Sequence, residues 1–149
     1  MIVRFFKSYD YQVSDNDLNL FEKHIGYTLP KDYREHMILW NGGVALQNNL
    51  VHRGFLDAGT DFALESLHPL IADHESSTVK AYWDFGTGDI LAKGYIPIGS
   101  AVGGDEIIMS LNSNGTYGNI KLQTDYGLIH DISSSFSQYL EDMIERTDK

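Results

Sequence analysis

Cysteine is absent from all 149 residues of this sequence. Its absence excludes a disulfide framework, thiol catalysis and zinc sites built from cysteine ligands. The composition fits a reducing compartment. Because 149 residues correspond to one domain of ordinary size, the chain is long enough to bury a core without covalent cross-links.

Long apolar stretches are also missing. The first residues, MIVRFFKSYDYQ, hold no apolar segment of the length that a signal peptide requires, and no later run is long enough to cross a bilayer. We therefore expect a soluble cytoplasmic protein without membrane contact. Asn114-Gly115-Thr116 matches a glycosylation acceptor, but without a secretory route we interpret it as a turn.

Basic residues are scarce: 11 Lys and Arg stand against 21 Asp and Glu, which gives a net charge of −10. Direct binding to nucleic acid is unfavourable for such a chain, since phosphate contacts require a basic face. Residues 1–56 hold six acids and six bases, residues 57–106 nine and two (net −7), and residues 107–149 six and three (net −3). A concentrated negative field attracts a basic partner. The alternative interpretation is that acidic side chains only keep the protein in solution.

Complete catalytic motifs are not found. There is no phosphate-binding P-loop and no nucleophile elbow. His74-Glu75 begins like a zinc-protease motif, but Thr78 stands where the second histidine ligand is required. Asp15-Asn16-Asp17 begins like a calcium loop, yet Leu20 and Gly26 replace its glycine and its bidentate glutamate. We expect no enzyme activity, no metal and no cofactor.

Two chemical alternatives stay open. His68, Asp73 and His74 are close enough in sequence to share a metal ion if a loop folds back, although their spacing does not form a chelate. The carboxylates Asp84, Asp89, Asp105 and Glu106 offer material for a general acid and base. An exposed acidic rim is the simpler interpretation of the same residues.

The first third of the chain predicts two helices. Ser14 is expected to cap the first helix with Asp17 as its capping-box partner, and Gly26 to end it. Leu29-Pro30 restart the backbone for a second helix over residues 31–40, since proline suits a first helical turn. Asn41-Gly42-Gly43 provide a left-handed cap.

The C-terminal part predicts strands and a last helix. Strands are expected at residues 95–98, 106–111 and 118–123, with a candidate fourth at 128–129 and a turn at residues 112–115. The apolar spacing of Phe136, Tyr139, Leu140, Met143 and Ile144 predicts a closing helix. Residues 9–13 fit a short strand or an ordered arm, and residues 48–55 are a candidate strand. Residues 62–67 fit a strand or a helix, and residues 76–83 fit a short helix. The pattern predicts one α+β domain over residues 1–149, with N-terminal helices, an antiparallel meander and a C-terminal helix.

Four segments, in order, resemble a known family. They are the segment from Gly26 to Tyr33 with Leu29-Pro30 inside it and Asn41-Gly42-Gly43 after it, Ile96-Pro97-Ile98-Gly99, the run from Gly104 to Leu111, and Ser133-Ser134-Ser135-Phe136. Together they resemble the SUKH superfamily, the syd and killer-toxin-resistance homology group that includes cell-wall-assembly regulators. Residues 44–93 match the pattern poorly, and a partner-specific surface is expected to diverge there.

The resemblance implies a bacterial immunity protein of a polymorphic or contact-dependent toxin system. Such a protein binds a cognate toxin domain, often a nuclease with a basic cleft, and needs no catalytic residues. A non-catalytic intracellular regulatory or scaffold module is the alternative that the same superfamily implies. The sequence leaves the oligomeric state open.

The expected toxin contacts follow from charge and aromatic content, not from the family motif. Tyrosine and tryptophan are common at binding hot spots, although aromatics on a short helix also fill cores. The predicted contact set is Asp57, Asp61, Tyr82, Trp83, Asp84, Asp89, Asp105 and Glu106. The motif residues Leu29, Pro30, Tyr33, Asn41, Gly42 and Gly43 are assigned to the scaffold.

Overall fold

Three helices and nine strands are placed in the part of the chain that the computed structural model describes, which comprises residues 6–7, 12–45, 50–52, 64–70, 94–101, 105–123 and 129–145. The helices are α1 (Asp15–Ile25), α2 (Lys31–Trp40) and α6 (Phe136–Glu141). The strands are β1 (Phe6–Lys7), β2 (Gly43–Ala45), β3 (Leu50–His52), β4 (Leu64–Leu67), β5 (Tyr95–Ala101), β6 (Glu106–Ser110), β7 (Ile120–Gln123), β8 (Ile129–Ser133) and β9 (Met143–Glu145).

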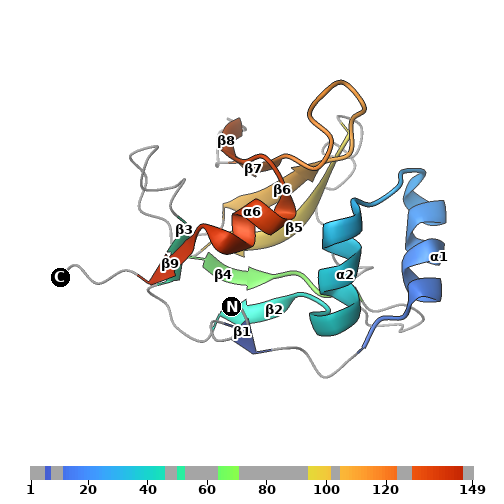
Figure 1. Cartoon of the computed structure of the whole chain (residues 1–149), viewed down its shortest axis with the longest axis horizontal. Helices are drawn as coiled ribbons and strands as arrows, with labels where there is room; N and C mark the ends of the chain where they lie inside the picture. The colour runs from blue at the N-terminus through green and yellow to red at the C-terminus, as the bar shows by residue number, and fades with distance from the viewer. Residues whose placement is uncertain are drawn as a thin grey trace.

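Seven of these strands form one antiparallel sheet in the order β1-β2-β4-β5-β6-β7-β8 (Figure 1). From β4 to β8, neighbours in the chain are neighbours in the sheet, so the predicted meander is confirmed. Residues 62–67, which fitted either a strand or a helix, contribute strand β4. β3 and β9 form a separate antiparallel pair.

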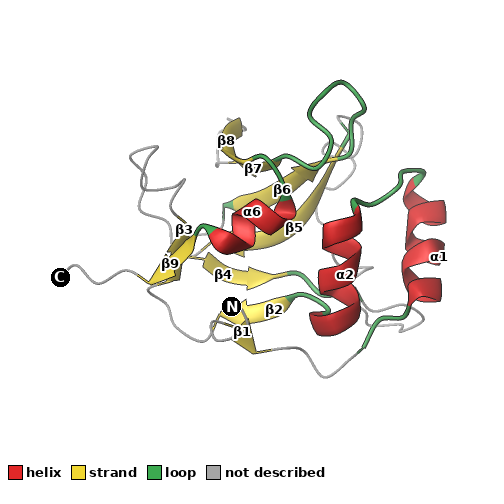
Figure 2. Ribbon diagram, viewed as in Figure 1, coloured by secondary structure: helices red, strands yellow, loops and turns green. Residues whose placement is uncertain are grey.

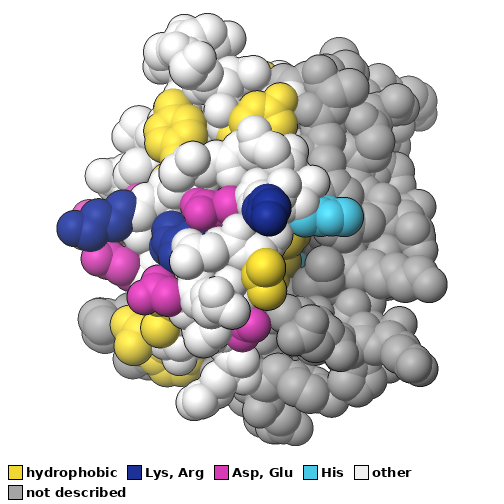
Figure 3. Space-filling model, turned by 90° about the vertical axis from the view of Figure 1, so that its right-hand side faces the viewer, with side chains coloured by type: hydrophobic (Ala, Val, Ile, Leu, Met, Phe, Trp, Pro, Cys, Tyr) yellow, Lys and Arg dark blue, Asp and Glu magenta, His cyan; other side chains and the backbone are white. Residues whose placement is uncertain are grey.

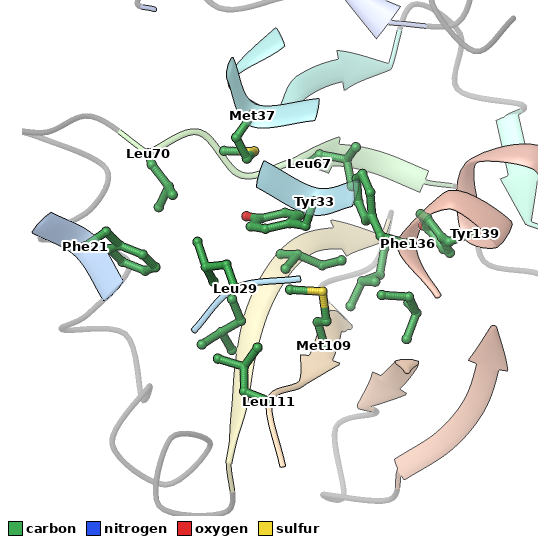
Figure 4. Close-up of a cluster of buried hydrophobic side chains, with 14 of the residues drawn as sticks. Phe21, Leu29, Tyr33, Met37, Leu67, Leu70, Met109, Leu111, Phe136 and Tyr139 are labelled. Carbon is green, nitrogen blue, oxygen red and sulfur yellow. The ribbon is translucent and has the colours of Figure 1, made fainter. Parts of the chain in front are cut away.

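The helices α2 and α6 cover one face of the sheet, and α1 lies beside α2 on the side away from α6 (Figure 2). The core between the layers joins helix and sheet residues, and Figure 4 shows a part of it in which aromatic and aliphatic side chains pack together. The ring of Tyr33 meets the ring of Phe136 edge-on, with centroids 5.1 Å apart, and Phe136 stacks on Tyr139 at 6.4 Å. These contacts hold α2 and α6 together across about 100 residues of sequence.

Helix α1 begins and ends as its sequence predicts. The Ser14 hydroxyl accepts a hydrogen bond from the backbone N–H of Asp17, and the Asp17 carboxylate accepts one from the N–H of Ser14. This reciprocal capping box satisfies two N–H groups that the first turn leaves free. Gly26 ends the helix with φ +79°. The helix presents Leu18 and Phe21 to the core, and Ile25 packs against them.

Helix α2 spans the predicted residues, with one shift at its start. Pro30 occupies the N-cap position, with φ −58° and ψ 145°, and its carbonyl accepts the first helical hydrogen bond from the N–H of Arg34. Proline fits this position because its fixed φ matches the observed backbone and it has no N–H to satisfy. Tyr33 and Met37 are buried, and Trp40 is half-buried.

The Asn-Gly-Gly segment fastens the end of α2 to the sheet. Asn41 is left-handed (φ 48°), and its buried side-chain oxygen accepts a hydrogen bond of 2.7 Å from the N–H of Leu70, just past β4. Gly42 has φ +88°, and a Cβ there would lie 2.6 Å from the carbonyl oxygen of Leu67. His36 donates from Nε2 to the Gly42 carbonyl at 2.9 Å. The scaffold role expected for this segment therefore has a physical basis in close packing and buried hydrogen bonds.

The predicted C-terminal helix is wrong in its length. Helix α6 ends at Glu141, and Met143 and Ile144 belong to strand β9, which pairs with β3 in the register Val51↔Ile144. An apolar pattern of i, i+3, i+4, i+7 does not by itself extend a helix, because a strand partner from a distant segment offers the same backbone groups a competing set of hydrogen bonds. The N-cap at Ser135 satisfies the N–H of Gln138, so the helix start follows the sequence.

The remaining sequence expectations are met in part or lie outside the described residues. Strands β5, β6 and β7 lie where they were expected, β3 falls inside residues 48–55, and β8 runs on to Ser133 past the predicted residues 128–129. In place of a tight turn over residues 112–115, the structure has a bend at residues 113–115 and a turn at residues 117–118 within the longer loop between β6 and β7. The short helix expected over residues 76–83 lies outside the described residues, as do most of residues 9–13.

Candidate functional site

Six members of the predicted contact set, Asp57, Asp61, Tyr82, Trp83, Asp84 and Asp89, lie outside the described residues. The two that the structure places, Asp105 and Glu106, stand next to each other at the start of β6 and differ in exposure. Asp105 is only 5% exposed, so its carboxylate offers little surface to a partner. Glu106 is about one-third exposed at its side chain and is paired with His68.

The pair of Glu106 and His68 lies on the sheet face that points away from the helices. Strand β6 alternates, with Ile107 and Met109 in the core and Glu106 and Ile108 on the opposite face. His68 Nε2 stands 3.2 Å from Glu106 Oε2, and the two side chains are 24% and 32% exposed. A partly exposed pair of this kind holds the Glu106 carboxylate in place while leaving part of its charge open to solvent.

The same face carries an ion pair farther along the sheet. Lys121 on β7 stands opposite Ile108 on β6, and its ammonium contacts the carboxylate of Asp131 on β8. Lys121 is buried along its length, whereas Asp131 is 84% exposed at its side chain. The long lysine stem thus covers apolar surface of the sheet while its charge meets a carboxylate at the edge.

The side of the molecule that carries α1 has a mixed surface. Figure 3 shows basic, acidic and apolar side chains interspersed there, without a continuous patch of one kind in the described part. Arg34 joins α2 to α1 through contacts of 3.0 Å with both Asp15 and Glu22 and donates to Asn19 at 3.2 Å. Because the single positive charge of Arg34 is shared between two carboxylates, this side is less acidic by one charge than its number of acids suggests.

A third surface is formed by the loop between β6 and β7, Leu111–Asn119. No charged residue occurs in it, and Tyr117 near its end is 44% exposed. The Tyr117 hydroxyl donates a hydrogen bond of 2.6 Å to the carbonyl of Thr28 in the turn between α1 and α2. Sequence reasoning interpreted this loop only as a turn. The signal that points further is its composition of Asn, Ser, Gly, Thr and Tyr, which is also typical of antibody binding loops.

Neither a metal-ligand group nor a membrane-spanning helix is found in the described part of the chain. No group of three or more His, Asp or Glu side chains is positioned there to hold a metal ion, and His74 and Asp73 of the proposed metal cluster lie outside it. Within the same residues no helix has the length and apolar character that crossing a bilayer requires.

Taken together, the described part of the chain is a two-layer α+β domain whose surfaces carry ion pairs and polar side chains. Comparison with protein-family models matches the SMI1 / KNR4 family (SUKH-1) over residues 12–142. The chain belongs to this family, which confirms the resemblance carried by its four motifs. The comparison with curated proteins found no match.

Family membership sets the class of function. SUKH proteins are in general non-catalytic proteins of immunity or regulation, and they act through protein–protein interaction, with toxins as a general class of partner. An immunity role for this chain is consistent with that membership.

Proposed function

We propose that this chain is an immunity protein that binds and neutralises a cognate toxin domain, a basic nuclease of a polymorphic or contact-dependent system, in the cytoplasm of the cell that makes it. The observation that carries the proposal is the family match over residues 12–142 in a chain whose residues 57–106 hold nine acids and two bases. Neutralisation by binding requires no catalytic group of the immunity protein itself.

Electrostatics supplies the mechanism. A nuclease cleft carries lysine and arginine side chains that contact phosphates. Carboxylates presented by another protein satisfy the same groups and exclude the substrate, and opposite fields raise the association rate by roughly 10–10³-fold. A net charge of −7 within residues 57–106 gives this chain the required sign in one part of its sequence.

The contacts proposed within that region are Asp57, Asp61, Tyr82, Trp83, Asp84, Asp89 and Glu106. Among these residues, Glu106 lies in the described part of the chain, and its side chain is 32% exposed. Asp105 belongs to the predicted set but is 5% exposed, so we do not propose it as a direct contact.

Co-expression tests the proposal. A toxin domain encoded beside this chain's gene should arrest growth when expressed alone and should be tolerated when this chain is expressed with it. The two proteins should co-purify, and raising the salt about tenfold should weaken the complex, because the Debye length then falls roughly threefold and charge–charge attraction is screened. Growth arrest that this chain does not relieve, for any basic domain encoded next to it, would contradict the proposal.

A further inference from the structure

The loop Leu111–Asn119, which extends outward between β6 and β7 in Figure 1, carries an exposed Asn-Gly pair. Asn114 and Gly115 are both exposed, and a Cβ added at Gly115 would meet nothing within 4 Å. Within the described residues, neither the N–H of Gly115 nor the amide nitrogen of Asn114 takes part in a hydrogen bond. Both nitrogen atoms are therefore accessible to solvent.

An asparagine that precedes glycine can lose its side-chain amide without an enzyme. Hydroxide from the solvent removes the proton of the Gly115 N–H, and the nitrogen attacks Cγ of Asn114. The new C–N bond pushes the carbonyl electron pair onto Oδ1. When this pair returns, the bond from Cγ to Nδ2 breaks, and Nδ2 takes a proton from water and leaves as ammonia. Glycine favours the attack because it has no side chain to hinder the nitrogen or to restrict its backbone.

A chain of hydroxyl groups leads to the oxygen on which this charge develops. Asn114 Oδ1 accepts from the Thr116 hydroxyl at 2.6 Å and from the Thr116 N–H at 3.3 Å. Because the single hydroxyl proton of Thr116 is used in that bond, the 2.8 Å contact between Thr116 Oγ1 and Ser110 Oγ is donated by Ser110. Ser110 is fully buried and accepts in turn from the N–H of Asn112 at 3.2 Å. We call Ser110 and Thr116 the hydroxyl relay.

The hydroxyl relay is placed to stabilise the intermediate of amide loss. Donors that already point at an oxygen on which negative charge develops lower the free energy of the transition state. Consecutive hydrogen bonds also polarise one another, so the buried Ser110 strengthens the donor that reaches Asn114. The bond from the Thr116 N–H additionally folds the Asn114 side chain back over the backbone of Gly115, whose nitrogen is the attacking atom.

The second Asn-Gly pair of the chain lies in the opposite environment. Asn41 is only 1% exposed and is held at φ 48° and ψ 56°, with its Oδ1 bound to the N–H of Leu70. Gly42 is packed so closely that a Cβ would lie 2.6 Å from the Leu67 carbonyl oxygen. Hydroxide and water have little access to this pair, so the same dipeptide should be stable there.

We propose that Asn114 is a self-modification site, which forms a succinimide with Gly115 and loses ammonia with the assistance of the hydroxyl relay. Water then opens the succinimide at either of its two carbonyl carbons and leaves aspartate or isoaspartate. Either product adds one negative charge to a loop, Leu111–Asn119, that has no charged residue in the sequence. The inference concerns the chemistry of this chain alone and does not depend on the proposed toxin.

The test follows both Asn-Gly pairs in the folded full-length chain during incubation in a mildly alkaline buffer. Samples are digested under acidic conditions, and mass spectrometry measures the fraction of each asparagine that has become a carboxylic acid. A synthetic peptide of residues 111–119, which lacks Ser110 and the fold, is the reference. Asn114 should react about 2–10-fold faster in the protein than in the peptide, the equivalent of one ordinary hydrogen bond, and Asn41 should remain an amide. An equal or slower reaction of Asn114 in the protein would overturn the proposal.

Variants isolate the hydroxyl relay. Thr116→Val removes the hydroxyl with little change of shape and should slow the loss at Asn114 by about 2–10-fold in the protein, but not in the peptide. Thr116→Ser keeps a hydroxyl and should react as the parent does. Ser113→Ala is the control, because Ser113 is exposed and its hydroxyl forms no hydrogen bond within the described residues. An unchanged rate in folded Thr116→Val would refute the relay. If that variant does not fold, the comparison of the parent protein with the peptide decides.

Discussion

Gly42 shows how one residue type is required by its surroundings. It combines a left-handed φ of +88° with a position where a Cβ would meet the carbonyl oxygens of Leu67 at 2.6 Å and His68 at 2.7 Å. Both carbonyls belong to the backbone at the end of β4, so they cannot rotate away as a flexible side chain could. The glycine therefore allows α2 to end directly against the sheet.

Replacing this glycine should be costly. Gly42→Ala is expected to destabilise the fold by about 2–5 kcal/mol, because left-handed strain and overpacking add. Gly26→Ala is the matched control: it has φ +79°, and an added Cβ would meet nothing within 4 Å, so only the strain of about 1–2 kcal/mol applies. Urea unfolding followed by circular dichroism measures both. Equal losses for the two variants would show that the close approach to β4 contributes nothing.

His36 gives the fold a pH dependence. Burial lowers its pKa, against the opposing effect of its hydrogen bond to the Gly42 carbonyl, and its ring also packs edge-on against Phe136 at 5.1 Å. The folded state therefore holds a neutral imidazole, whereas the unfolded chain binds a proton near pH 6.5. Since the unfolded state binds more protons in this window, the contribution of His36 should be lost as the pH falls through about 6.5 and should level off below the folded pKa.

The measurement compares the parent with His36→Gln, which keeps a donor for the Gly42 carbonyl but does not titrate. Unfolding free energies from about pH 8 to about pH 5 should converge as the pH falls, with the difference changing by up to about 1.4 kcal/mol per pH unit. Because both proteins carry the other five histidines, their contributions cancel in the difference between the two unfolding free energies. A constant difference over the whole range would mean that His36 has the same pKa in both states.

At the scale of elements, Asp32 joins the first part of the chain to the last. Its Oδ1 accepts from the N–H of Tyr33 within α2, and its Oδ2 accepts from both the N–H and the hydroxyl of Ser137 in the first turn of α6. One carboxylate thus lies at the N-termini of two helices, where negative charge is favourable for both macrodipoles. Although α6 has only six residues, it is fixed by this contact and by the burial of Phe136 and Tyr139.

Removing the carboxylate should loosen α6. Asp32→Ala is expected to cost about 1–3 kcal/mol because it leaves several N–H and O–H groups without their acceptor. Asp32→Asn retains one oxygen and should cost roughly half as much. Amide hydrogen exchange at Ser137 and Gln138 locates the effect: these amides should lose protection more than those of α1. Uniform loss of protection over the chain would instead indicate a global rather than a local role.

At the C-terminal end of the chain, the local apolar spacing predicts the start of helix α6 but not the strand that follows it. Ser135 as an N-cap and the apolar positions of the first helical turns were predictable, and they are present. The conversion of residues 143–145 into a strand was not, because the partner strand at residues 50–52 is about 90 positions away in the sequence. Strand formation there depends on a pairing that no local window contains.

At the scale of the whole molecule, the uneven distribution of charge along the sequence is the property from which the proposed association with a toxin follows. Replacing Asp57, Asp61, Asp84 and Asp89 by Asn removes four charges from the region of net −7. Under the proposed function, association with the toxin should slow by about 10-fold or more at low salt, and the difference should shrink as salt is raised. Stopped-flow or surface-based association kinetics measure the rate. Asp105 is left unchanged because it is buried, and its replacement would test folding rather than binding.

A control variant with the same change in net charge shows whether the association rate depends on where the charges lie or only on their total number. Replacing the exposed acids Asp15, Glu35, Asp131 and Glu141 by their amides also removes four charges, but from positions outside residues 57–106 of the sequence. This variant should slow association clearly less, provided that its circular dichroism spectrum matches that of the parent, since Asp15 and Asp131 also pair with Arg34 and Lys121. Equal slowing by both sets would contradict a localised acidic contact, even though it would leave the immunity function intact.

The sequence by itself determined the family, the order of the two helices and the meander strands, and the ends of α1, because these depend on caps, turns and motifs that are complete within a few residues. Its acidic balance also follows from composition alone. Tertiary structure decided the remainder: that Asp105 is buried while the adjacent Glu106 reaches solvent beside His68, that the last apolar residues form a strand, and that Tyr117 is held against Thr28. Each of these outcomes depends on a contact between segments far apart in the chain, and such contacts arise only when the sheet and the helices pack together.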